Sequence, residues 1–111
     1  MDALELAHQI REAALAKKAT NVLIFDVRGR SPITDFIVLA SASSPPQLKA
    51  IEGEVQRTLR EHNVHCYRCS GRPDDLWIAL DYVDVVMHIL TADLRDYYAF
   101  EELWATVPRL D

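Results

Sequence analysis

The chain has 111 residues and a mass of 12.6 kDa, the length of one ordinary domain with room for a genuine core. Hydrophobic residues make up 50% of it and charged residues 26%, which excludes a disordered or fibrous chain. The net charge of −5 is uneven, since residues 1–73 carry +2 and residues 74–111 carry −7. An acidic C-terminal third repels phosphate, so we expect no direct nucleic-acid readout there. It suits a basic partner surface or, alternatively, a solvated face kept for solubility.

The first element is a predicted helix that begins after Asp2 and ends near Lys18. Asp2 and Glu5 have the spacing of a capping box, and the apolar residues that follow recur at helical spacing. Nothing in this segment resembles a secretory signal, and the longest uncharged stretch, residues 36–48, is too short and too polar to span a bilayer. We therefore expect a cytoplasmic protein without membrane contact, whose two cysteines are thiols.

Two strands and a second helix come next. Residues 21–27 (NVLIFDV) and 34–40 (TDFIVLA) are short, apolar and rich in β-branched side chains, which is typical of buried strands. Ser44 can cap a helix that has Pro45 in its first turn and Gln47 as the second half of a capping box. The apolar stripe of this helix ends near His62, and it consists of Leu48, Ile51, Val55 and Leu59.

Three further strands and a last helix are predicted for the rest of the chain. The strands are residues 64–69, 76–81 and 84–90, of which the last two are close enough to form a hairpin. A helix then follows a cap at Thr91 and continues to Trp104. The order αββαβββα predicts one α/β domain over residues 1–111, with a mixed sheet of about five strands and flanking helices.

The stretch HNVHCYRC, residues 62–69, contains the residue types of a zinc site: His62, His65, Cys66 and Cys69. Structural zinc usually joins two ligand pairs from separate segments, whereas these four residues share one octet. If residues 64–69 form a strand, the two cysteines point to opposite faces and cannot bind one ion. We therefore expect cysteines that pack as small hydrophobic residues, with a zinc-binding regulator as the alternative.

Catalytic motifs are sparse. The glycines are isolated, and neither a phosphate-binding GxGxxG or GxxxxGK[ST] loop nor a GxSxG nucleophile turn occurs. The enzyme hypothesis would use Asp81 and Asp84 as a carboxylate pair, for metal binding or acid–base work, with His88 as a base. A histidine within an apolar strand is more typical of a partly buried structural residue.

The predicted hairpin has one apolar face and one mixed face. A two-residue turn at Tyr82 and Val83 would place Asp81 opposite Asp84, and Trp77 opposite His88. The mixed face would then consist of Trp77, Ala79, Asp81, Asp84, Val86 and His88, and the core face of Leu76, Ile78, Leu80, Val85, Met87 and Ile89. Opposed carboxylates are destabilising unless a cation relieves them, and an aromatic residue beside an acidic rim is typical of a protein interface. The alternative is that the first or last helix covers this face and Trp77 belongs to the core.

Several segments together resemble the ribosomal silencing factors of the Iojap family. They cover about residues 17–104 and are, in chain order, Lys18-Ala19, the strand ending in FDV, TDFIVLASASSPPQLKAI, Ser-Gly followed by WIALDYVDVVMHI, and RDYYAFEELW. The joint occurrence of W-x-x-L-D-Y-x-D-V-V-x-H and R-x-Y-Y-x-x-E-x-L-W is specific. The resemblance implies an α/β domain similar to the nucleotidyltransferase fold but without its catalytic motif. Here Ser43-Ser44 precedes the helix with no glycine, and no D-x-D pair occurs, so we expect no enzyme, metal or cofactor.

The resemblance also implies a partner and a role. Family members bind the large ribosomal subunit through its basic ribosomal protein fourteen, block joining of the small subunit, and so repress translation when nutrients are short. A homodimer is a further state that the resemblance implies. The residues expected to bind the partner are Trp77, Ala79, Asp81, Tyr82, Asp84, Val86 and His88.

Two positions depart from the family pattern. Ser70 stands where members usually have glutamate, so any ion pair of that glutamate is absent. Val83 stands where the hairpin usually has glycine. Because a β-branched residue disfavours positive φ, the turn could be wider than two residues, which would change the strand register.

Overall fold

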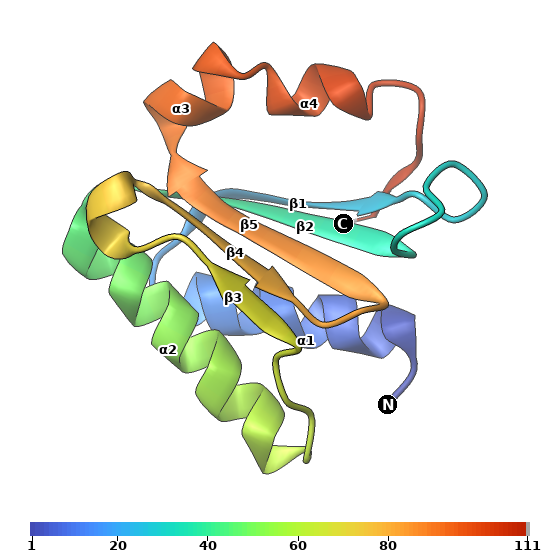
Figure 1. The fold of residues 1–111 in the computed structure, drawn as a ribbon, viewed down its shortest axis with the longest axis horizontal. Helices are drawn as coiled ribbons and strands as arrows, with labels where there is room; N and C mark the ends of the chain where they lie inside the picture. Colours follow the sequence, from blue (N-terminus) through green and yellow to red (C-terminus); the bar gives the residue numbers. More distant parts are fainter. Residues whose placement is uncertain (111) are drawn as a thin grey trace.

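The computed structural model describes residues 1–110, which form a six-stranded sheet with helices on both faces (Figure 1). One face is covered by α1 (Ala3–Ala16) and α2 (Pro45–Glu61), and the other by the shorter α3 (Ala92–Tyr97) and α4 (Phe100–Leu103). A 3₁₀ turn, η1 (Pro73–Asp75), joins two strands. The strands are β1 (Thr20–Asp26), β2 (Phe36–Ala42), β3 (Arg68–Ser70), β4 (Trp77–Asp81), β5 (Val85–Thr91) and β6 (Arg109–Leu110).

The strand order is β3-β4-β5-β2-β1-β6, and β2 and β5 form the parallel pair at its centre. The remaining pairs are antiparallel, so the sheet is mixed, as the sequence predicts. From the carboxyl ends of the parallel pair the chain leaves in two directions. It enters α2 on one face of the sheet and α3 on the other. Such a switch point is where open α/β sheets commonly hold ligands.

The predicted helix starts are confirmed in part. The side chain of Asp2 accepts a hydrogen bond from the Glu5 N–H (2.8 Å), and Ser44 Oγ accepts one from the Gln47 N–H (3.3 Å). The side chain of Gln47 does not complete the predicted box with Ser44. Its Oε1 accepts from the Ser43 N–H and Oγ–H instead, and its Nε2 donates to the carbonyls of Lys17 and Lys18. This residue thereby ties the start of α2 to the end of α1.

Two apolar clusters hold the layers to the sheet. The larger cluster lies between the sheet and α1 and α2, and it includes the predicted stripe of α2, whose four members are fully buried. The smaller cluster lies on the side of α3 and α4 and contains Phe25, Val27, Ile37, Leu39, Leu90, Phe100 and Val107. Since both faces of β2 are covered, the whole strand is buried and shows no alternation of apolar and polar residues.

Three predicted elements differ from the structure. Residues 64–67 are not a strand, because β3 begins only at Arg68. The predicted last helix is two helices, since Ala99 adopts a left-handed conformation (φ 50°) between α3 and α4. A sixth strand of two residues, β6, pairs with β1, and a strand so short leaves no periodic signal in the sequence.

Candidate partner-docking face

The last pair of the hairpin of β4 and β5 is Asp81 with Val86, so four residues, 82–85, lie between the paired positions rather than the predicted two. Ala79 pairs with His88, and Asp81 with Val86. The predicted pairs Asp81–Asp84 and Trp77–His88 are therefore wrong. Val83 has φ 75° and is accommodated by the longer turn, which shifts the register by two residues. Because side chains alternate with period two, this shift leaves every strand residue on its predicted face.

We call the mixed side of this hairpin the docking face, and it comprises Trp77, Ala79, Asp81, Asp84, Val86 and His88. Its strand residues are half-buried, and Asp84 lies exposed in the turn. On the opposite side Ile78, Leu80, Val85, Met87 and Ile89 are fully buried, and Leu76 is half-buried against the same cluster. The predicted division of the hairpin into a core face and a mixed face is confirmed.

Trp77 is the largest side chain of the docking face, and the α3–α4 segment partly covers it. Its indole stacks edge-on against Phe100, with ring centroids 5.1 Å apart, and lies 5.3 Å from the ring of Tyr98. The α3–α4 segment thus covers part of this face. The alternative in which the last helix covers the face and Trp77 belongs to the core is therefore partly correct. The residue belongs to the rim of the smaller cluster and keeps an accessible edge.

The side chain of His88 holds the indole of Trp77 through a hydrogen bond. Trp77 Nε1–H donates to His88 Nδ1 (3.1 Å), which requires a histidine that is neutral at that nitrogen. Burial lowers the pKa of His88, so the neutral form is favoured at physiological pH. The role that the structure gives His88 is thus to orient Trp77.

The carboxylates of the docking face lie around the turn. Asp81 Oδ1 accepts a hydrogen bond from the Val83 N–H (2.8 Å), which fixes the turn. The backbone carbonyl of Asp84 accepts from Asp35 and Phe36, so the turn is tied to the loop before β2. The carboxylate of Asp84 lies in no ion pair among residues 1–110. It is therefore available to a cation from outside.

Tyr82 points away from the docking face. Its side chain is 7% exposed and packs in the larger cluster, and burial raises the pKa of its hydroxyl. A side chain so placed offers a partner little surface, although it anchors the turn to the core.

The four residues of the HNVHCYRC stretch do not form a metal site within the described part of the chain. Cys66 Sγ donates to the carbonyl of Arg68 (3.1 Å), and Cys69 Sγ donates to Glu52 Oε2 (3.4 Å). Burial raises the pKa of both thiols, that of Cys69 to about 11. Thiolates are the metal-binding form, and these thiols are protonated at neutral pH. No group of three or more His, Cys, Asp or Glu residues among residues 1–110 is placed to hold a metal ion.

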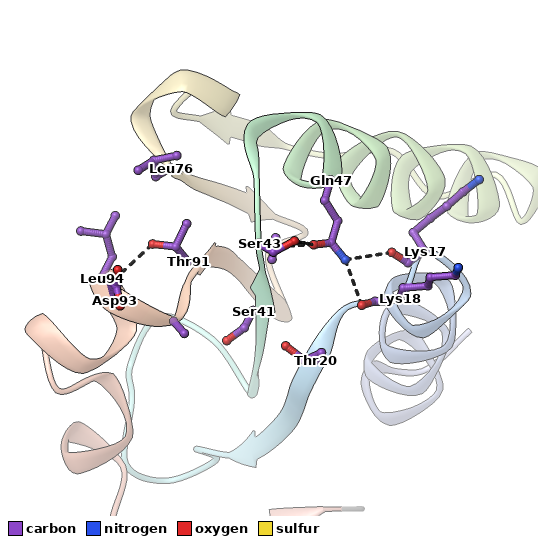
Figure 2. Close-up of a pocket in the computed structure, with 12 residues that line it drawn as sticks. Lys17, Lys18, Thr20, Ser41, Ser43, Gln47, Leu76, Thr91, Asp93 and Leu94 are labelled. Atoms are coloured by element: carbon purple, nitrogen blue, oxygen red, sulfur yellow. Dashed lines mark hydrogen bonds between the residues drawn. The ribbon is translucent and has the colours of Figure 1, made fainter.

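A cleft of about 900 Å³ lies at the switch point, between the ends of β2 and β5 (Figure 2). Several of its polar side chains have partners within the chain, whereas Lys17, Lys18 and Asp93 lie in no ion pair among residues 1–110. Gln47 crosses from α2 to Ser43 and to the carbonyls of Lys17 and Lys18, and Thr91 Oγ1 accepts from the Leu94 N–H. Pro45 and Pro46 remove two N–H donors from the start of α2. The start of α2 thus has few donors left for a phosphate group.

The local sequence pattern assigns no independent role to Arg95, whose side chain is 4% exposed. Its Nε donates to Glu101 Oε1 (2.7 Å), and its Nη1 donates to the Asn21 carbonyl (2.7 Å) and Ser41 Oγ (2.9 Å). These bonds fix α3 and α4 against β1 and β2, and so place Phe100 over Trp77. A signal was present, because Arg95 and Glu101 are the charged residues of R-x-Y-Y-x-x-E-x-L-W.

This architecture is that of a small α/β domain with a mixed six-stranded sheet, whose half-buried tryptophan and exposed carboxylate lie on one face of a hairpin. A family model described as "Ribosomal silencing factor during starvation" matches residues 1–111. The chain belongs to this family, which is one of ribosomal regulators and not of known enzymes. No helix within residues 1–110 has the length and apolarity needed to cross a bilayer.

Individual relatives agree with this assignment. The ribosomal silencing factor RsfS of Halalkalibacterium halodurans is 33% identical over 86% of this chain and 81% of its own length. The chloroplastic protein Iojap of Zea mays is 27% identical over 99% of this chain and 48% of its own length. A crystal structure from Chromobacterium violaceum has 28% identity and a TM-score of 0.90, covering 95% of this chain and 88% of that one. A second, from Bacillus halodurans, has 30% identity and a TM-score of 0.84, covering 97% and 98%.

Proposed function

We propose that the protein represses translation by binding the large ribosomal subunit through the docking face, with the basic ribosomal protein fourteen as its contact. Its bulk then occupies space that the small subunit needs, so the two subunits cannot join. Family membership supports a ribosomal partner. The proposal needs no chemical step, and it places the action in the cytoplasm when nutrients are limiting.

The observation that carries the proposal is a single hairpin face that holds a partly accessible tryptophan at one end and two aspartates near the turn at the other. Trp77 is fixed by His88 and Phe100, so little rotamer freedom is lost when a partner covers it. Aromatic residues of this kind dominate the binding energy of many interfaces. Asp81 and Asp84 supply negative charge that a basic protein surface complements.

The charge distribution agrees with this choice of partner. Residues 74–111, which include the whole docking face, carry −7, whereas the rest of the chain carries +2. Such a charge repels exposed ribosomal RNA and attracts a basic ribosomal protein. A second copy of this chain presents the same acidic face, so a homodimer would need another surface.

A sucrose gradient of purified large and small subunits tests the proposal. Under joining conditions, an excess of the protein should reduce the joined-ribosome peak, and the protein should travel with the large subunit. Undiminished joining with the protein at the top of the gradient would contradict the proposal. Addition of isolated ribosomal protein fourteen as a competitor should restore joining if that protein is the contact.

A further inference from the structure

The hairpin turn carries a side chain that suits its backbone poorly. Among residues 1–110, six non-glycine residues have positive φ, and Val83 (φ 75°) is the β-branched one. Two methyl-bearing branches on Cβ crowd the backbone in this conformation, which glycine or asparagine adopts far more readily. The valine therefore destabilises the turn that it occupies.

Packing within the chain does not offset this strain. The side chain of Val83 is 54% exposed, so little of its apolar surface is removed from water. Other groups hold the turn. The Asp81 carboxylate accepts a hydrogen bond from the Val83 N–H, and the Tyr82 N–H donates to the Val85 carbonyl (2.9 Å). The ring of Tyr82 is also buried in the core. The turn would form without the valine side chain.

A second apolar side chain lies at the same end of the sheet. Ile33 is 77% exposed and sits in the loop of residues 27–35, which Figure 1 shows beside the hairpin turn. The Asp35 N–H donates to the Asp84 carbonyl (3.0 Å), which joins this loop to the turn. We call Ile33 and Val83 the apolar knob. Asp35, Asp81 and Asp84 are its acidic neighbours along the chain, and the loop also carries Arg28, which pairs with Asp26, and Arg30, which donates to Thr106 Oγ1.

We infer that the apolar knob is a specificity-determining contact, which enters an apolar hollow on the basic large-subunit protein next to the docking face. The inference rests on the proposed function. Asp81 and Asp84, which flank Val83, supply charge complementarity to that partner and make the knob continuous with the docking face. Backbone strain that persists is commonly found at functional sites, and a contiguous exposed apolar patch with polar neighbours marks an interaction surface.

The inference predicts opposite effects on stability and binding. Val83→Gly relieves the strain, so the Tm should rise by about 4 °C, while affinity for isolated large subunits should fall by about fivefold to tenfold. If Val83 had a purely structural role, its substitution would change the Tm and the affinity in the same direction, or would leave the affinity unchanged. Val83→Asn tolerates positive φ without the flexibility of glycine, so it should reproduce both effects.

The experiment measures equilibrium binding to isolated large subunits and the Tm of each purified variant. Ile33→Ser should weaken binding with no change in Tm. The control is Leu15→Ser, which changes another exposed apolar residue on α1, in the layer across the sheet, and should leave binding unchanged. If the wild type binds and the Val83 variants bind equally well, the inference about the apolar knob is wrong and the proposed function stands. If the wild type does not bind, both are wrong.

Discussion

The two ends of the central sheet differ in shape and in the side chains that they expose. The cleft at the switch point looks like a ligand site, yet Gln47, Ser43 and Thr91 are all engaged in hydrogen bonds. The opposite end presents the exposed, strained Val83 and the carboxylate of Asp84, which lies in no ion pair among residues 1–110. The hollow thus lies at one end, whereas the turn of the docking face that we propose presents an exposed apolar side chain beside a carboxylate.

The largest expected effect is on Trp77. Trp77→Ala should weaken binding to large subunits by about 2 kcal/mol or more, roughly 30-fold, if the indole is buried by the partner. The matched control is Trp104→Ala, which removes a half-buried indole from the same cluster but outside the docking face. Thermal unfolding should show both variants destabilised. Equal binding losses in the two would mean that folding, not contact, explains the result.

A substitution at the cleft end should lower stability without weakening binding. Gln47→Ala removes the bonds to Ser43 and to the carbonyls of Lys17 and Lys18, so the free energy of unfolding should fall by about 1 kcal/mol. Subunit binding should not change. Gln56→Ala, in the same helix, serves as the control in denaturant titrations. A binding loss for the Gln47 variant would break the comparison, because it would make the cleft part of the interface.

The pH dependence of stability should reveal His88. Its pKa in the folded protein lies below the unfolded value of about 6.5, so the unfolded state binds more protons between the two values. Stability is therefore full above pH 6.5 and falls as the pH is lowered toward 5. Thermal melts should show this decline, and His88→Gln should flatten it. An unchanged slope in the variant would assign the effect to another group.

The smallest effect belongs to the acidic rim. Asp81→Asn and Asp84→Asn should each weaken binding by a few tenths of a kcal/mol to about 1 kcal/mol at low salt. The loss should come mainly from slower association, and it should vanish as salt rises through the screening range. Association rates measured at several ionic strengths check this. Rates that do not depend on salt in the wild type would remove the steering role of both residues.

Much of the fold could be predicted because its signals are local. Caps at Asp2 and Ser44 and the period-two pattern of the hairpin gave both main helices and the correct faces of β4 and β5. The register failed because one left-handed residue, Val83, widens the turn, and sequence alone does not fix such a conformation. The prediction of one continuous last helix failed for the same reason, because Ala99 also adopts a left-handed conformation.

The sequence predicted which residues share the docking face better than it predicted their contacts. The alternation of residues placed Trp77 and His88 on one face, but their hydrogen bond depends on the register, which the turn decides. Phe100 and Arg95 act on this face from a distant segment, and nothing in the local pattern says where α3 and α4 pack. Those contacts needed the tertiary structure.

A cryo-EM reconstruction of the large subunit with the protein bound tests the central claim most directly. The account predicts that the docking face and the turn at Val83 lie against the basic ribosomal protein fourteen, with Trp77 covered and the cleft open to solvent. Contact through the cleft or through the layer of α1 and α2, with Trp77 and Asp84 facing solvent, would contradict it.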